Sequence, residues 1–252
     1  MPSIEANLAS WNRDWGHDGS DWSSAWGSTA AMWRGSVLAR IAPFVPTGAL
    51  LEIAPGRGRL TEHLLPLCTS YVGIDLAPAC VAACRERFAD VGHARFAPTD
   101  GKTLPGVDDA SVDFAFSWDS LVHAAKDVLR AYVGELARVL RPGASAFVHH
   151  SNLAAFVDGD TGKLTVENPH WRDPTVSAEL VRQACREHGL SCHVQELVQW
   201  GVPYHNDCFT LLQRPTDGAV PSGEPVHIEH PDLNAEAVLF RAFAQSYWLT
   251  SR

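Results

Sequence analysis

The sequence predicts an α/β protein built on a largely parallel sheet with helices on both faces. Between Gly48 and Asp113, short apolar runs alternate with helix-like stretches, the pattern of βαβ units. Two later apolar runs follow one another without an intervening helix, which predicts an antiparallel hairpin at the end of the sheet. With 252 residues and 46% hydrophobic content, the chain can build one sizeable core.

Seven segments have the composition of strands, since they are rich in β-branched, aromatic and other apolar residues and are flanked by turn residues. In chain order they are residues 50–54, 71–74, 94–97, 112–117, 145–149, 191–199 and 208–212. The clearest helices are expected over residues 60–67, 78–89, 126–140 and 177–188. Arg141-Pro142-Gly143 is expected to end the third helix, because proline and glycine stop helices.

The first 47 residues form a tryptophan-rich segment before the predicted core unit of residues 48–214. The tryptophans are Trp11, Trp15, Trp22, Trp26 and Trp33. Their spacing would align them on one helix, but Gly16, Gly19 and Gly27 predict two short helices joined by turns. The indoles either fill contacts on the core or form a helical lid over a substrate, with Trp26 touching it.

Two further segments lie outside the regular alternation. Residues 151–174 are polar and are expected to form an insertion on the substrate side. Residues 214–231 carry four prolines and predict an extended linker, so residues 215–252 are expected to be a linker and a C-terminal helix. In that helix Leu239, Phe243 and Tyr247 share a face at four-residue spacing, and we expect the tail to pack on another part of a protein.

Charge and composition restrict the partners. The formal charge is −9 and no Lys/Arg cluster is present, which disfavours RNA or DNA as a partner, because phosphate binding needs a concentrated cationic face. No stretch approaches the roughly 18 apolar residues of a membrane span, and the N-terminus does not read as a signal peptide. The six cysteines contain no Cys-x-x-Cys pair. We therefore expect a cytoplasmic protein with reduced cysteines and no membrane partner.

The run from Leu50 to Leu60 is the most informative part of the sequence. It reads as a strand that turns through Gly56 and Gly58 into a helix, and glycine is needed where the backbone passes close to a ligand at the sheet edge. Thr61 stands where a dinucleotide-binding fingerprint has its third glycine, which disfavours an NAD-linked enzyme. Glu52 offers a carboxylate to the ammonium end of an amino-acid-like ligand.

Two more acids follow successive strands. Asp75 ends the second predicted strand, where an acid can accept both hydrogen bonds of a ribose diol. Asp100, followed by Gly101, comes after the third strand, where a carboxylate can accept from an adenine amino group. Together with Glu52 and the glycine turn, these acids predict a site for a nucleoside that carries an amino-acid end.

The motifs together resemble those of the class I S-adenosylmethionine-dependent methyltransferase family, over about residues 48–212. They are Leu-Glu-Ile-Ala-Pro-Gly-Arg-Gly-Arg-Leu, Gly-Ile-Asp-Leu, Thr-Asp-Gly, Val-Asp-Phe-Ala-Phe-Ser-Trp-Asp-Ser-Leu-Val-His and Leu-Ala-Arg-Val-Leu-Arg-Pro-Gly. The resemblance implies a Rossmann-like sheet of seven strands with the last antiparallel, and S-adenosylmethionine as cofactor. Ser-Trp-Asp-Ser-Leu-Val-His and Val-His-His-Ser-Asn are also similar to strings in bacterial methyltransferases of sugar and secondary-metabolite (antibiotic-type) hydroxyls.

The resemblance also implies roles for individual residues. The implied cofactor-binding residues are Glu52, Ala54, Pro55, Gly56, Gly58, Asp75, Leu76, Asp100, Gly101, Ser117 and Trp118. Ser117-Trp118-Asp119-Ser120 stands where enzymes that methylate amino groups of bases have Asn or Asp, two prolines and an aromatic residue, which disfavours such acceptors. A small molecule with a hydroxyl group is the expected acceptor.

Methylation of a hydroxyl needs a base, and histidine suits that task near neutral pH. His123 follows the fourth predicted strand and is our first candidate, and His150 at the end of the fifth is our second. His149 and His150 are neighbours on one strand, so at most one should point directly into the pocket. Asp119, His149 and Asn152 are expected to contact the substrate.

Other interpretations stay open from the sequence. Asp119, His149, His150 and Asn152 could hold magnesium on a substrate diol, but we do not favour a metal, because Mg²⁺ prefers oxygen ligands. The acceptor could be a small amine, which needs less help from a base. The chain could also be a non-catalytic nucleoside-binding module. The oligomeric state stays open.

Overall fold

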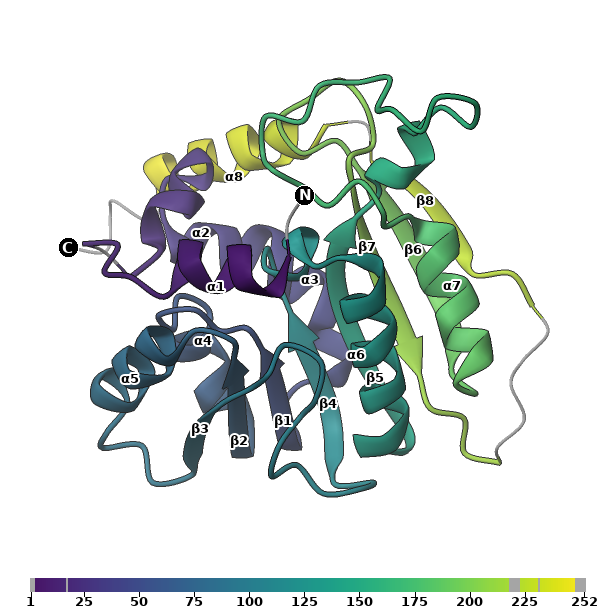
Figure 1. Cartoon of the computed structure of the whole chain (residues 1–252). Helices are drawn as coiled ribbons and strands as arrows, with labels where there is room; N and C mark the ends of the chain where they lie inside the picture. The colour runs from purple at the N-terminus through teal and green to yellow at the C-terminus, as the bar shows by residue number, and fades with distance from the viewer. Residues whose placement is uncertain (1–2, 17, 218–222, 231, 248–252) are drawn as a thin grey trace.

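The computed structural model describes residues 3–16, 18–217, 223–230 and 232–247. Its strands, in chain order, are β1 Thr47–Ile53, β2 Cys68–Asp75, β3 Ala94–Pro98, β4 Val112–Ser117, β5 Leu140–Ser151, β6 Ser191–Val198, β7 Asp207–Gln213 and β8 Val226–His230. They form one sheet of order β3-β2-β1-β4-β5-β7-β6-β8 (Figure 1). Strands β3, β2, β1, β4 and β5 run parallel to one another, and β7 is antiparallel to both β5 and β6. This is a Rossmann-like α/β fold.

The eighth strand corrects the predicted count of seven. The sequence indicated an extended linker over residues 214–231, but Val226–His230 pairs in parallel with β6, from Val194 opposite Val226 to Val198 opposite His230. Residues 226–229 are exposed, so the strand buries no face and carries no alternating hydrophobic signal. Backbone pairing with the edge of the sheet holds it in place.

Helices cover both faces of the sheet (Figure 1). They are α1 Ile4–Trp11, α2 Thr29–Met32, α3 Leu38–Ile41, α4 Thr61–Leu64, α5 Pro78–Arg87, α6 Lys126–Val139, α7 Ala178–Glu187 and α8 Leu233–Tyr247, with the short turns η1 Ser20–Trp26, η2 Trp33–Val37, η3 Ala42–Phe44, η4 Leu65–Leu67, η5 Leu121–His123 and η6 Leu153–Phe156. Successive strand residues face opposite sides, so Leu51 packs with α6 and α7 while Leu50 packs with α2 to α5 and α8. Two apolar layers therefore sandwich the sheet.

The predicted helices are present with small shifts at their ends. Helix α6 stops at Val139 and β5 begins at the next residue, so Arg141-Pro142-Gly143 lies inside the strand rather than ending the helix. The expected tail helix is α8, and it packs on the N-terminal helices as predicted, but not through the face that carries Leu239, Phe243 and Tyr247. Leu233 and Ala237 are buried, whereas Leu239 and Phe243 are 52% and 41% exposed. The helix lies on the N-terminal helices through its other side.

The glycines of the N-terminal segment interrupt it as predicted. Gly16, Gly19 and Gly27 all have positive φ angles, and Gly19 and Gly27 bound the turn η1. The cysteines are all free thiols. Within the described ranges, none of the helices has both the length and the apolar character that crossing a bilayer requires.

Candidate functional site

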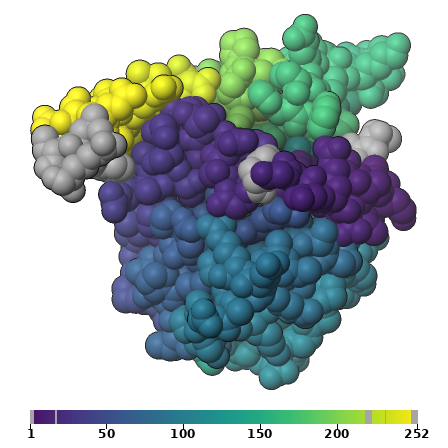
Figure 2. Space-filling view, turned by 90° about the vertical axis from the view of Figure 1, so that its left-hand side faces the viewer, coloured from purple at the N-terminus to yellow at the C-terminus, as the bar shows by residue number. Residues whose placement is uncertain are grey.

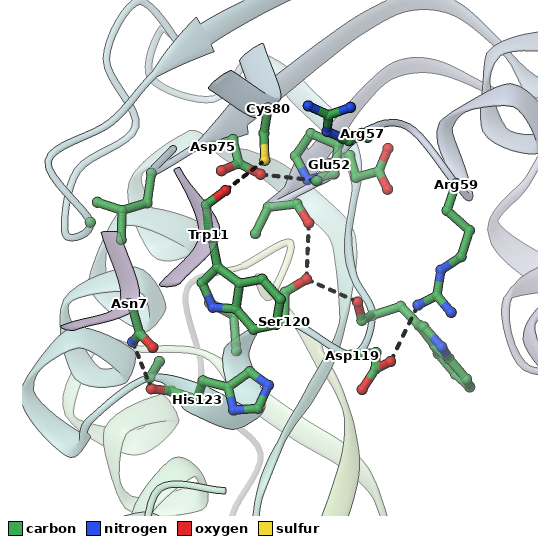
Figure 3. Close-up of a pocket in the computed structure, with 18 of the residues that line it drawn as sticks. Asn7, Trp11, Glu52, Arg57, Arg59, Asp75, Cys80, Asp119, Ser120 and His123 are labelled. Carbon is green, nitrogen blue, oxygen red and sulfur yellow. Dashed lines mark hydrogen bonds and ion pairs between the residues drawn. The ribbon is translucent and has the colours of Figure 1, made fainter. Parts of the chain in front are cut away.

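A cavity opens where the carboxyl ends of β1, β2 and β4 meet, beneath the N-terminal segment (Figure 3). Figure 2 shows this segment, in purple, between the blue part of the chain and the green part. The predicted site residues that line the cavity are Glu52, Ala54, Pro55, Gly56, Asp75, Leu76, Gly101, Trp118, Asp119 and His123. The carboxyl edge of a parallel sheet is where such folds bind ligands.

The glycine turn forms one wall of the cavity. Ala54 and Gly56 have φ angles of 59° and 60°, and the amide of Gly56 donates to Asp75 Oδ2 over 2.9 Å. Gly58 has a φ of 87° but lies outside the cavity, where a Cβ would come within 2.5 Å of the Phe88 ring. Gly58 therefore permits close packing of the turn on α5, while Gly56 brings backbone next to the cavity.

Two buried carboxylates stand at the strand tips. Glu52 accepts hydrogen bonds from Thr61 Oγ1, over 2.7 Å, and from the Tyr71 hydroxyl, and burial raises its pKa to about 7. Asp75 accepts from the amides of Gly56 and Ala77, and burial raises its pKa to about 6. A buried acid with a raised pKa gains from a partner that stabilises its ionised form, such as an ammonium group.

The loop after β3 reaches the cavity with Gly101 but not with Asp100. The Asp100 side chain is exposed, and its Oδ1 accepts from the amides of Lys102 and Thr103 over 2.8 Å. The Asp100 carboxylate thus stabilises its own loop, and the side chain predicted to bind the adenine amino group does not line the cavity.

The tryptophans of the N-terminal segment divide into two groups. Trp11, Trp15 and Trp22 line the cavity, with ring centroids 5.1 to 5.8 Å apart. Trp26 and Trp33 are only 3% and 6% exposed and belong to the core. The lid interpretation therefore fits the first three indoles and the core interpretation fits the last two. Trp26, the indole expected to touch the substrate, does not line the cavity and lies against Trp200.

We call Trp11, Trp15 and Trp22 the tryptophan cap. Two arginines for which the sequence predicted no role contact this cap. The Arg57 guanidinium lies over the Trp15 ring at 5.6 Å, and that of Arg59 lies over Trp22 at the same distance. Arg59 Nη2 also lies 3.3 Å from Asp119 Oδ2 (Figure 3). The motif Gly-Arg-Gly-Arg contained this signal, since both arginines closely follow Gly56, the glycine that lines the cavity.

The residues that follow β4 differ in their access to the cavity. Ser117 is buried, and its hydroxyl has no partner among the described residues; it does not line the cavity, whereas Trp118 does. Asp119 adopts a φ of 54° and donates its amide to His149 Nδ1 over 3.0 Å. This left-handed backbone is uncommon outside glycine, and it points the Asp119 carboxylate between Arg59 and Arg172.

The predicted site residues at the end of β5, which are His149, His150 and Asn152, do not line the cavity. His149 is buried, with Nε2 3.0 Å from Asp207 Oδ2. His150 points to the opposite side, where both ring nitrogens are bonded, to the Ser151 carbonyl and to Thr210 Oγ1. The structure thus does not bring His150, our second candidate base, to the cavity. Asn152 bonds the backbone of His205 and Ala178, and no group of side chains in the described ranges is arranged to hold a metal.

Among the described residues, His123 is the histidine that reaches the cavity (Figure 3). Its Nδ1 lies 2.9 Å from the carbonyl oxygen of Trp171. A carbonyl can only accept, so Nδ1 carries the proton and Nε2 keeps its lone pair. Burial, reinforced by the Arg172 charge, lowers the pKa of His123, which keeps the ring neutral at physiological pH.

Part of the chain is similar in sequence to known methyltransferases. Residues 50–143 match the family model described as a methyltransferase domain. The rRNA adenine N-6-methyltransferase of Streptomyces fradiae is 39% identical over 74 residues, which are 28% of this chain and 23% of that protein. The match therefore spans less than a quarter of that relative's length.

Solved structures show the same fold at low identity. A SAM-dependent methyltransferase from Leishmania major superposes with a TM-score of 0.63 at 14% identity, over 83% of this chain and 82% of that one. A protein described in the conversion of a disulfide bond into a thioacetal group during echinomycin biosynthesis gives a TM-score of 0.52 at 23% identity, over 73% and 82% of the two chains. At these identities the likeness concerns the fold. Residues 50–143 thus match a methyltransferase domain, and the chain has the fold of a SAM-dependent methyltransferase. The match implies S-adenosylmethionine as the cofactor.

Proposed function

We propose that this protein is an S-adenosylmethionine-dependent methyltransferase that methylates a hydroxyl group of a small molecule, with His123 as the base. The observation that carries the proposal is the hydrogen bond from His123 Nδ1 to the Trp171 carbonyl. It leaves Nε2 as an acceptor at a cavity that also contains the glycine turn and Asp75. A sugar or natural-product intermediate is the acceptor we favour.

The residues of the cavity fit the cofactor. The backbone at Gly56 approaches the cavity with no side chain in between, and a Cβ there would come within 3.2 Å of Trp15. We assign the methionine end to Glu52 and the Ala54–Gly58 turn, and the ribose to Asp75. The indoles of Trp11, Trp15 and Trp22 offer π faces to a cationic sulfur. When bound, S-adenosylmethionine supplies a methyl group on a positively charged sulfur, which becomes a neutral thioether once the methyl is lost.

The chain's own residues then perform two tasks. The cap and the glycine turn exclude water and align the acceptor oxygen, which is the main contribution a positioned site makes to a displacement reaction. His123 Nε2 takes the proton of the acceptor hydroxyl as the new carbon–oxygen bond forms. The neutral ring of His123 is the form that can accept this proton.

The similarity to rRNA adenine N-6-methyltransferase supports a second candidate, methylation of an amino group on RNA. Two features of this chain disfavour it. The formal charge is −9, which opposes RNA phosphates. Ser117-Trp118-Asp119-Ser120 also lacks the paired prolines of enzymes that methylate base amino groups. A small amine is the remaining alternative acceptor, and it would need no base.

Calorimetry with S-adenosylhomocysteine, followed by methyl transfer from labelled donor, tests the proposal. We expect the wild-type protein to bind S-adenosylhomocysteine and the Asp75→Asn variant to bind it more weakly, while neither binds NAD. The labelled methyl should then appear on hydroxylated glycosides or phenols and not on rRNA. Label found in rRNA or on amines would reject the hydroxyl acceptor, and an absence of S-adenosylhomocysteine binding would reject the methyltransferase itself.

A further inference from the structure

A second cavity lies beside the first and shares a wall with it. Asn7, Trp11 and His123 line both cavities, and this wall is held by a hydrogen bond of 2.9 Å from Asn7 Nδ2 to the His123 carbonyl (Figure 3). Trp11 and His123 lie side by side within it, with ring centroids 5.6 Å apart. The far side of the second cavity is formed by Asn168, Trp171 and Arg172, from the polar segment between β5 and α7. A molecule in the second cavity therefore lies next to His123, a residue that also lines the first cavity.

Trp171 has a conformation and an exposure that stability does not explain. Its φ is 54°, in the left-handed region that bulky side chains avoid because the Cβ crowds the backbone. Its indole is 75% exposed, so the strain is not offset by burial of the ring. Strained backbone that the surroundings maintain is concentrated at binding sites. The same residue bonds His123 through its carbonyl.

The neighbouring residues hold Trp171 in this conformation. The side chain of Asn168 bonds both the amide and the carbonyl of Arg172, over 2.9 and 2.8 Å. The Arg172 guanidinium is buried, lying 2.8 Å from Asp207 Oδ2 and 3.5 Å from Asp119 Oδ1. Arg172 is the one charged side chain among the described residues that line the second cavity, and its charge is balanced by these two carboxylates. The cavity thus presents an apolar platform without net charge.

We propose that this second cavity binds the methyl acceptor, and that the acceptor is an uncharged hydroxylated ring that stacks on the Trp171 indole. The inference rests on the proposed function, because it places the ring's hydroxyl toward His123. Indole faces bind planar or pyranose rings through their apolar surface, and a balanced Arg172 offers no free cation to a carboxylate or phosphate. Trp171 is thus a specificity-determining residue, distinct from the residues that hold the donor.

Three variants separate a binding role from a structural one. Trp171→Gly removes the platform and also relieves the left-handed strain, so the midpoint of thermal unfolding should not fall by more than about 2 °C. Trp171→Phe keeps an aromatic face. Phe243→Ala is the matched control, since it removes an aromatic side chain that is 41% exposed on α8, outside both cavities.

The experiment measures binding of ring probes to the protein saturated with S-adenosylhomocysteine, by saturation-transfer NMR. The neutral probes are methyl glycosides of hexoses and deoxyhexoses on one arm and catechol on the other, with glucuronic acid as the charged counterpart. We expect one neutral arm to bind, Trp171→Gly to weaken it at least about tenfold, and Trp171→Phe and Phe243→Ala to change it by less than about threefold. The affinity for S-adenosylhomocysteine should be the same in all four proteins.

The contrary outcomes are distinct. If no neutral probe binds, if glucuronic acid binds as well as the neutral rings, or if Trp171→Gly leaves probe binding unchanged, the inference is wrong while the methyltransferase proposal stands. An equal loss of probe and S-adenosylhomocysteine binding in Trp171→Gly would show a structural role and also overturn it. Failure of the wild-type protein to bind S-adenosylhomocysteine would instead reject the proposed function.

Discussion

The two sides of the site are built in different ways. The proposed donor side, beneath the N-terminal tryptophans, comes from strand tips and the turn after β1, inside the segment 50–143 that matches the methyltransferase family model. Apart from His123, the proposed acceptor side comes from α1 and from the loop around Trp171, both outside that segment. On the donor side, burial leaves Glu52 and Asp75 with raised pKa values, ready for a charged partner. On the acceptor side the buried charges of Arg172 and Asp207 already pair with each other.

Under the proposed assignment, the carboxylates of the donor side gain their charged partner from the ligand, whereas the charges of the acceptor side are already paired within the protein. A carboxyl group whose pKa is raised by burial costs stability when it ionises without a partner. A buried ion pair is costly chiefly when one member is removed. The two sides should therefore respond differently to substitution and to pH.

The largest effect should follow from breaking the acceptor-side ion pair. We expect Asp207→Ala to lower the free energy of unfolding by about 3 to 5 kcal/mol, because it leaves Arg172 buried without its main partner. Urea denaturation followed by circular dichroism measures this. Asp100→Ala, on the exposed loop of the donor side, is the control and should change stability by less than about 1 kcal/mol. Equal stability of the two variants would show that the pair does not hold the acceptor side.

The same pair predicts a pH dependence. Burial alone would raise the pKa of Asp207, but the Arg172 charge outweighs it and lowers the pKa to about 2, below the ordinary value of 3.8. The pair's stabilisation is thus present above pH 3.8 and is lost as the pH falls toward 2. Acid titration of wild type against Asp207→Asn checks this, and the variant should lose less stability over that interval. A parallel decline in both proteins would contradict the assignment.

The two groups of tryptophans should differ in how much stability their removal costs, and the larger cost should be comparable to that of Asp207→Ala. Trp26→Ala should cost about 3 to 5 kcal/mol, the usual effect of removing a fully buried indole. Trp22, which is 41% exposed, should cost much less stability when changed to alanine and should instead weaken S-adenosylhomocysteine binding. Thermal unfolding and calorimetry on both variants decide this. The division of the segment into core and cap fails if Trp22→Ala destabilises the fold as much as Trp26→Ala does.

A smaller effect, on rate alone, is expected at the wall between the two sides. His123→Ala should lower kcat about 10²-fold, the range for a lost general base, with the affinity for S-adenosylhomocysteine nearly unchanged. His150→Gln is the matched variant: it removes a buried, bonded ring outside the cavity, so it should reduce stability but leave kcat of the folded protein near the wild-type value. Stopped assays with labelled donor measure both. A wild-type rate in His123→Ala removes the base assignment.

The smallest effect concerns the donor side and pH. Glu52 has a pKa of about 7. If its carboxylate binds the ammonium group of the ligand, the affinity for S-adenosylhomocysteine should increase as the pH rises toward 7, by up to about tenfold per pH unit, and level off above 7. The ligand-free protein should lose stability over the same rise, because a raised carboxyl pKa favours folding in the protonated form. Calorimetry between pH 5.5 and 8 on wild type and Glu52→Gln tests this. An identical pH dependence in the variant would exclude Glu52 as the source.

The difference between the two sides also explains what could be predicted from the sequence. The seven strands and the glycine turn follow from local hydrophobic runs and from backbone requirements that glycine alone meets. The pairing of Arg172 with Asp207 spans 35 residues and the bond between His123 and the Trp171 carbonyl spans 48, so no local pattern encodes them. The alternation of side chains along β5 correctly predicted that His149 and His150 point to opposite faces of the sheet. It did not indicate that Asp119 would lie between His149 and the cavity. Strand β8 was missed because it buries no face.

The wall between the cavities has a consequence for shortened forms of the protein. Helix α1 has no buried residue, so deleting the residues before Ser20 should leave the sheet and both apolar layers folded. Such a chain would still contain the whole segment 50–143, but it would lack Asn7, Trp11 and Trp15. Because these residues line the cavities, the two cavities would join and open to solvent. A stable but inactive truncated protein is therefore the expected product, and inactivity in that form would be a property of the deletion rather than of the enzyme.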